Sequence, residues 1–226
     1  MENKKNTILL TVIAVATLLV AVVGATFAYF TAQGGSASQA DVVVQTGKAG
    51  SSSMAAFDPI NIYADATNFN QTTKQNRTGS TTGEVKWTAP TSTAGSTVSE
   101  ADRSFCYTAT LSITNNTFVV SSTNTTGAAE LTFSAKRNSD ILVENQDITT
   151  VGNNGAATSE HPVEVKIPTT KGGNQYTFKL LPNAGESITD TWTLTATLVN
   201  LEVDQNDNTG KSFAGAVKFT KVNCQW

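Results

Sequence analysis

Alternation of apolar and polar residues with a period of two dominates the second half of the chain. It is clearest over residues 188–201, where threonines occupy one parity and apolar residues the other: Ile188, Trp192, Leu194, Ala196 and Leu198. Successive side chains of a strand point to opposite faces, so the pattern predicts a strand with one face in a core. At helical spacing neither set would form a stripe, which argues against a helix.

The same alternation recurs along the chain. It predicts strands over 105–114, 131–136, 163–167, 176–180 and 213–222. Asn115 and Asn116 are expected to form a two-residue hairpin turn, with a return strand over 118–120. Residues 171–174 are expected to form the turn of a second hairpin, which joins 163–167 to its partner strand 176–180.

Fewer apolar residues occur in the first half of the chain. Pro59 makes residues 57–63 an expected edge strand, because proline cannot donate to a sheet ladder. The polar stretches 68–83 and 89–99 are expected to be long loops, and 48–53 a Gly/Ser linker. Nine to eleven short strands without an internal helix predict an all-β fold, an antiparallel β-sandwich of jelly-roll type.

The first thirty residues predict export. Lys4 and Lys5 precede an uncharged stretch over residues 7–30, which contains an apolar core over 8–23 and a small residue, Ala28, at the expected cleavage point. This is the order of a secretory signal peptide, an N-terminal hydrophobic leader helix that is cleaved, here between Ala28 and Tyr29. A retained membrane anchor is the alternative, because the stretch is long enough to span a bilayer. No basic cluster follows the stretch to stop transfer, and cleavage is therefore preferred.

Three segments follow from this. Residues 1–28 are the expected signal peptide, 29–50 an extended segment or linker, and 51–226 a β-sandwich domain. The chain carries 15 basic and 18 acidic residues, a net charge of −3. A nucleic-acid partner is not expected, because it would require a clustered basic face. Membrane contact is expected only through an uncleaved leader.

The two cysteines, Cys106 and Cys224, both fall on the solvent-facing parity of their strands. In an exported protein they are expected to form a disulfide. Two free thiols, as in reducing surroundings, or an intermolecular link are the alternatives.

No constellation of residues for catalysis stands out. His161 is the one histidine, and zinc sites need several His or Cys ligands, so we expect a solvated loop histidine and no metal or cofactor. The run 204–210 is only faintly similar to a calcium loop, since its sixth position is Thr209 rather than Gly, and we expect a solvated turn. The chain is therefore not expected to be an enzyme.

The leader also resembles that of a known family. The string over residues 24–31, GATFAYFT, is similar to the leader of the TasA/camelysin family of secreted Gram-positive proteins, which a specialised signal peptidase cuts. Residues 200–205 and 210–213 resemble the C-terminal part of secreted proteins that share this leader. The resemblance implies a jelly-roll β-sandwich, secretion, and assembly into extracellular fibres of the biofilm matrix at the cell surface.

These observations predict a structural subunit that polymerises with itself, head to tail, by β-strand donation. The donor would be the mature N-terminus, with apolar contacts from Tyr29, Phe30, Val42, Val43 and Val44. The alternative is that residues 42–44 form an ordinary first strand of their own domain. A second class of function is a monomeric or membrane-anchored adhesion or ligand-binding module, with Trp87 and Tyr63 as aromatic platforms.

Overall fold

A computed structural model describes residues 50–224 except 56, 71, 73 and 93–96. The predicted leader and cleavage site, and the predicted donor residues Tyr29, Phe30 and Val42–Val44, lie outside these residues. The described elements are ten strands, one short helix and a 3-10 turn: β1 (Ser51–Met54), β2 (Ile60–Tyr63), β3 (Arg77–Thr88), α2 (Glu100–Arg103), β4 (Phe105–Asn116), β5 (Leu131–Arg137), β6 (Asp140–Asp147), β7 (Val163–Lys166), β8 (Thr177–Leu180), β9 (Ser187–Leu198), η1 (Asn206–Asn208) and β10 (Ser212–Val222). In this part of the chain, neither helical segment has the length and apolar character needed to cross a membrane.

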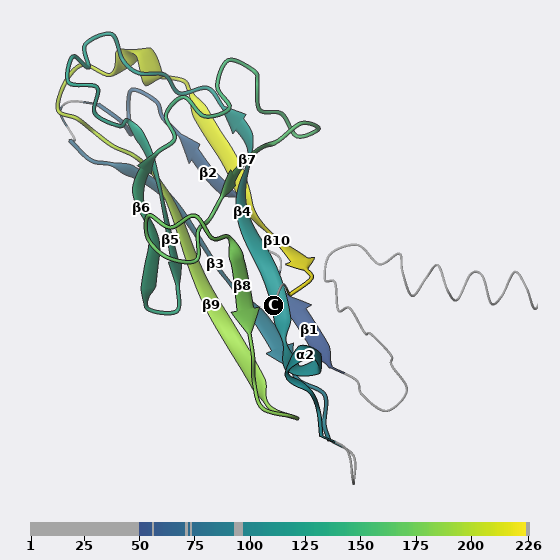
Figure 1. Cartoon of the computed structure of the whole chain (residues 1–226). Helices are drawn as coiled ribbons and strands as arrows, with labels where there is room; N and C mark the ends of the chain where they lie inside the picture. Colours follow the sequence, from purple (N-terminus) through teal and green to yellow (C-terminus); the bar gives the residue numbers. More distant parts are fainter. Residues whose placement is uncertain (1–49, 56, 71, 73, 93–96, 225–226) are drawn as a thin grey trace, which may run out of the picture. The chain divides into compact units, whose positions relative to one another are not determined.

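The strands form two antiparallel sheets that pack against each other (Figure 1). The first sheet has the order β1-β3-β9-β5-β6, and the second has the order β2-β10-β4-β7, with β8 also paired to β4. Aromatic rings join the two inner faces: Tyr107 of β4 lies edge-on to Trp192 of β9, with ring centroids 6.3 Å apart. The prediction of an all-β protein with packed antiparallel sheets is confirmed.

The alternating residues occupy the core as predicted. Along β4, the five apolar residues of one parity are at most 2% exposed, and Trp192, Leu194, Ala196 and Leu198 of β9 at most 1%. Two details differ from the prediction. Ile188, near the beginning of β9, is 36% exposed, and Cys106, predicted on a solvated face, is 4% exposed. Parity therefore gives the face of a residue, whereas position in the sheet decides its burial.

The prediction of a polar loop over 68–83 is confirmed for the described residues of 68–76 and wrong for 77–83, because β3 begins at Arg77 and pairs along all twelve residues with β9. The prediction rested on the polar composition of the stretch, but the glycines of β3 create room for the facing sheet. A Cβ at Gly83 would lie 2.3 Å from the ring of Phe57, and one at Gly79 would lie 2.8 Å from Ile60. Glycine in a strand marks this kind of close approach. The expected linker over 48–53 likewise contains β1, which pairs with β3.

Both predicted hairpins are also wrong. Strand β4 continues through Asn116, whose buried amide donates to the carbonyl oxygens of Ile148, Thr149 and Val151 at 2.9–3.2 Å. Residues 118–120 follow as a loop rather than a strand. Strands β7 and β8 do not pair with each other; they lie end to end along β4, opposite its residues 110–113 and 105–108.

Candidate functional site

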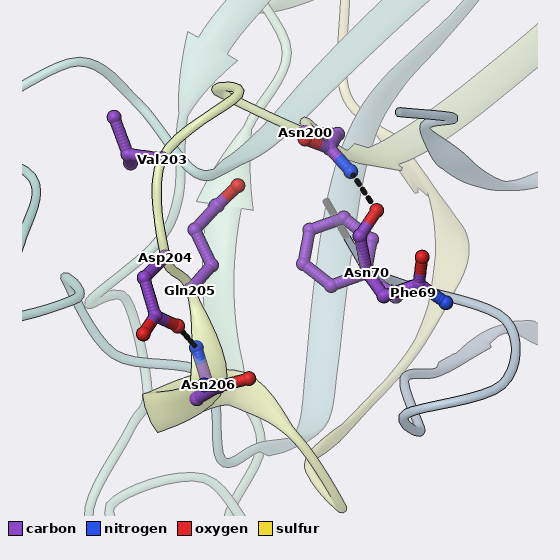
Figure 2. A pocket seen from close by; sticks show the side chains of 7 residues that line it. All are labelled: Phe69, Asn70, Asn200, Val203, Asp204, Gln205 and Asn206. Carbon is purple, nitrogen blue, oxygen red and sulfur yellow. Dashed lines mark hydrogen bonds between the residues drawn. The ribbon is translucent and has the colours of Figure 1, made fainter. Parts of the chain in front are cut away.

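A polar hollow of about 190 Å³ lies where the loop after β2 meets the loop before β10. It is lined by Phe69, Asn70, Asn200, Val203, Asp204, Gln205 and Asn206 (Figure 2). The Asn200 amide donates to the backbone oxygen of Asn70 at 3.1 Å, and the Asp204 carboxylate accepts from the Asn206 backbone N–H at 3.0 Å. The first bond joins the two loops, and the second lies within the loop before β10. Only one lining residue, Asp204, is ionisable, so the hollow offers hydrogen bonds rather than acid–base chemistry.

Beneath this hollow lies a buried carboxylate. Glu130 is 0% exposed and immediately precedes β5. Its two oxygens accept five hydrogen bonds at 2.7–3.0 Å, from the backbone and hydroxyl of Ser121 and the amides of Asn124, Gln205 and Asn208. Five donors use the acceptor capacity of the carboxylate and compensate for its burial.

The backbone around Glu130 is held as firmly as its side chain. Its N–H and that of Leu131 donate to the hydroxyl of Thr149 at 3.0 and 2.9 Å, and its carbonyl accepts from Val199 at 2.7 Å. The segment over 204–210 forms a turn, as predicted, and most of its residues are exposed, but Gln205 (6% exposed) and Asn208 (0% exposed) are buried. Sequence reasoning missed this cluster because its members are ordinary loop residues far apart in the chain.

A second buried polar cluster joins the two sheets. The hydroxyl of Tyr107 donates to Asp190 at 2.5 Å and accepts from the indole N–H of Trp192 at 3.2 Å. Tyr107 contacts Oδ2 of Asp190; Nε of Arg137 lies 3.6 Å from the other oxygen, Oδ1, and the side-chain amide of Asn138 donates to Oδ1 at 3.1 Å. Burial, together with the hydrogen bond to the Asp190 carboxylate, raises the pKa of Tyr107 well above its ordinary value. The cluster sits amid packed rings and serves to fix the sheets.

A wider hollow of about 420 Å³ lies between β6 and the connection from β7 to β8. Leu142, Val143 and Pro168 provide apolar surface in it, and Lys166 lies 5.7 Å from the ring centroid of Tyr176. Lys171 forms an ion pair with Glu144 across the hollow. An aromatic ring beside polar side chains is a surface that a small polar ligand can bind.

Several predicted site residues have definite places in the structure. Cys106 and Cys224 form a disulfide with a Cα–Cα separation of 5.3 Å. His161 is exposed in a loop, where its backbone N–H donates to the Thr158 hydroxyl at 3.0 Å. The prediction that Trp87 is an aromatic platform for a ligand is wrong, because Trp87 is 9% exposed, stacks on Phe105 and donates its indole N–H to a backbone oxygen. Tyr63, the other predicted aromatic platform, is 55% exposed.

No group of three or more His, Cys, Asp or Glu side chains within the described residues is arranged to hold a metal ion. Searches of protein-family models, curated proteins and solved structures return no significant match to this chain.

Proposed function

We propose that this protein is a secreted structural subunit that polymerises at the cell surface by β-strand addition, rather than an enzyme. The observation that best supports this proposal is an open strand edge in the first sheet. Strand β9 covers β3 along all twelve residues, whereas β1 covers only Val85–Thr88. Among the described residues, no strand pairs with the other side of β3 over 77–83.

The hydrogen-bonding groups of this open edge can be assigned. The carbonyl of Glu84 accepts from Ala55 N–H at 3.0 Å, so Glu84 turns its backbone groups toward the β1 side. Residues two apart in a strand point the same way, and Thr78, Ser80 and Thr82 therefore turn their N–H and C=O groups to the open edge. An exposed strand edge is a template for pairing with another chain. This edge lacks the proline and inward-facing charges that usually block such pairing.

The occupant that we propose is the mature N-terminal segment of a neighbouring copy. Strand β1 runs antiparallel to β3, with Ser51 opposite Thr88 and Met54 opposite Val85. The N-terminal end of β1 therefore lies beside Thr88, at the end of β3 away from residues 77–83. A segment of the same chain would have to reverse its direction to reach the open edge, whereas a donor from another copy would not. Repeated head-to-tail contacts of this kind grow into filaments.

The finer features of the fold belong to the same proposal. Strands β2-β10-β4-β7 face β3-β9-β5-β6, and most connections in sequence pass from one sheet to the other. This order supports a jelly roll to which β1 is added at an edge. Together with the predicted leader helix and signal peptide, it supports the resemblance to the TasA/camelysin family and a role in extracellular fibres.

Electron microscopy of the purified mature protein tests strand addition. Thr82→Pro removes an N–H that faces the open edge and leaves the β9 ladder complete, so the variant should fold and form no filaments. Asn61→Pro is the matched control. Ala64 turns its N–H and C=O to Lys211 and Gly210, which lead into β10, so Asn61, three residues earlier, turns its own N–H away from β10. Deletion of residues 29–45 should also abolish filaments. Filaments of folded Thr82→Pro protein would refute addition at this edge.

A ligand-binding module is the second candidate, and the hollow beside Tyr176 and Lys166 favours it. In that case the mature protein should remain as discrete particles, and a soluble glycan should perturb the fluorescence or NMR signals of Tyr176. Tyr176→Ala should remove that response, whereas Tyr63→Ala, a change of another exposed tyrosine, should not.

A further inference from the structure

A nucleophile, a base and an electrophile meet in the buried cluster around Glu130. The hydroxyl of Ser121 donates to Oε2 of Glu130 at 2.7 Å, and the side-chain amide of Asn208 donates to the same oxygen at 2.7 Å. Nδ2 of Asn208 lies 3.3 Å from Oγ of Ser121. The three residues are at most 2% exposed, so they have almost no contact with bulk solvent. The amide carbon of Asn208, Cγ, is bonded to this Nδ2 and therefore lies close to Oγ of Ser121.

The remaining contacts of Asn208 complete the arrangement. Its Oδ1 accepts a hydrogen bond from the backbone N–H of Val119 at 2.9 Å, and its Nδ2 donates to the carbonyl of Val119 at 2.9 Å. A backbone N–H aimed at an amide oxygen stabilises the negative charge that develops there when a nucleophile attacks the carbon. The amide is therefore held in one orientation, with its oxygen polarised and its nitrogen beside a carboxylate.

We propose that Ser121 and Asn208 form an intramolecular ester, with Glu130 transferring the proton. Glu130 removes the hydroxyl proton as Oγ of Ser121 attacks Cγ of Asn208, and the tetrahedral intermediate places its negative charge on Oδ1 beside Val119 N–H. The Cγ–Nδ2 bond then breaks, Glu130 returns the proton to the nitrogen, and one ammonia leaves. Glu130 ends as it began, and no oxidant, reductant or other reactant is required.

Burial favours this reaction in two ways. Groups held in contact react at an effective concentration far above that of free molecules in solution. Loss of ammonia to solvent makes the step practically irreversible, and the dry surroundings protect the ester from hydrolysis. The bond would occur once in each chain, so it is a self-modification rather than turnover of an external substrate.

The ester would complement the disulfide. Strands β10 and β4 pair from Phe213 opposite Asn116 to Val222 opposite Cys106. The disulfide of Cys106 lies at one end of this pair, and the loops that contain Ser121 and Asn208 follow and precede its other end. The two bonds would fix both ends of the second sheet. This inference does not depend on the proposed polymerisation.

Peptide mass spectrometry tests the inference on the purified, reduced and alkylated full chain. Trypsin should release peptide 104–136 joined to peptide 180–211, with a mass lower than their sum by about 17 Da, the ammonia lost in acyl transfer. Hydroxylamine, which cleaves esters, should separate the pair. Ser121→Ala and Glu130→Gln should each abolish the joined species, whereas Ser122→Ala, a change of the neighbouring serine, should retain it.

The wild-type result alone decides the matter, even if a variant fails to fold. Recovery of both peptides separately and at full mass, after incubation of the folded protein for days, would overturn the proposal. So would conversion of Asn208 to Asp without a joined species, since that would show attack by water in place of Ser121.

Discussion

The hydroxyl of Tyr107 donates a 2.5 Å hydrogen bond to Asp190, and through it β4 of the second sheet is joined to β9 of the first. Tyr107 is 0% and Asp190 2% exposed. A buried carboxylate is tolerated only when donors surround it, so this contact contributes more than its single bond.

Tyr107→Phe should therefore destabilise the fold. The variant keeps the ring packing but leaves Asp190 without its shortest hydrogen bond, and we expect a loss of about 1–3 kcal/mol in the free energy of unfolding. Urea titration of the mature protein measures it. Tyr176→Phe, a change of an exposed tyrosine, should alter the free energy of unfolding little. Equal stability of the two variants would contradict a structural role for the contact.

Alkaline pH should destabilise the protein through the same residue. Burial and the hydrogen bond to Asp190 raise the pKa of Tyr107 above its ordinary value of 10.0. Above about pH 10 the unfolded chain loses this proton while the folded chain retains it, so stability is complete below that pH and falls above it, by up to about 1.4 kcal/mol per pH unit. We expect the unfolding free energies of wild type and Tyr107→Phe to converge as the pH rises from about 8 to about 11. Parallel curves would exclude this linkage.

Removal of the disulfide should cost more than any single hydrogen bond. Cys106 and Cys224 are separated by 118 residues, and a loop of that size restricts the unfolded chain by about 4–5 kcal/mol in the chain-entropy model. The Cys106→Ala/Cys224→Ala double variant should show this loss in chemical denaturation. Reductant should destabilise the wild type and leave the double variant unchanged; a wild type insensitive to reductant would show that the bond does not form.

Gly83 should tolerate no side chain while Phe57 is present. A Cβ at this position would lie 2.3–2.7 Å from three ring atoms of Phe57, so Gly83→Ala should destabilise by about 1–3 kcal/mol through overpacking. Phe57→Leu creates space, and the double variant should lose less than the sum of the single changes. Thr82→Ala, at the exposed neighbouring position, serves as the control. Strictly additive losses would mean that the ring and the glycine do not compete for space.

The strands that the sequence predicted are those whose core residues are large and alternate strictly. Strand β3 escaped prediction because its inner face carries Gly79, Thr81 and Gly83 in place of large apolar residues. Its burial depends on Phe57 and Ile60 from elsewhere in the chain, which fill the space that the glycines leave. The donor segment and cleavage site predicted around Tyr29 remain predictions.

The buried cluster escaped prediction for a related reason. Ser121, Glu130 and Asn208 occur in polar surroundings that are typical of exposed turns. Nothing local distinguishes them from solvated residues, and only the approach of two loops, which are 87 residues apart at Ser121 and Asn208, removes them from water.

The sequence by itself determined that the chain is built of strands and which face most of them turn to the core, because alternation is a local property of an extended backbone. Only the tertiary structure decided that Asn116 extends β4 instead of turning, that Glu130 is buried, and that no described strand pairs with the β1 side of β3 over 77–83. Strand pairing and the satisfaction of buried polar groups depend on partners distant in sequence, and a local pattern does not specify those partners.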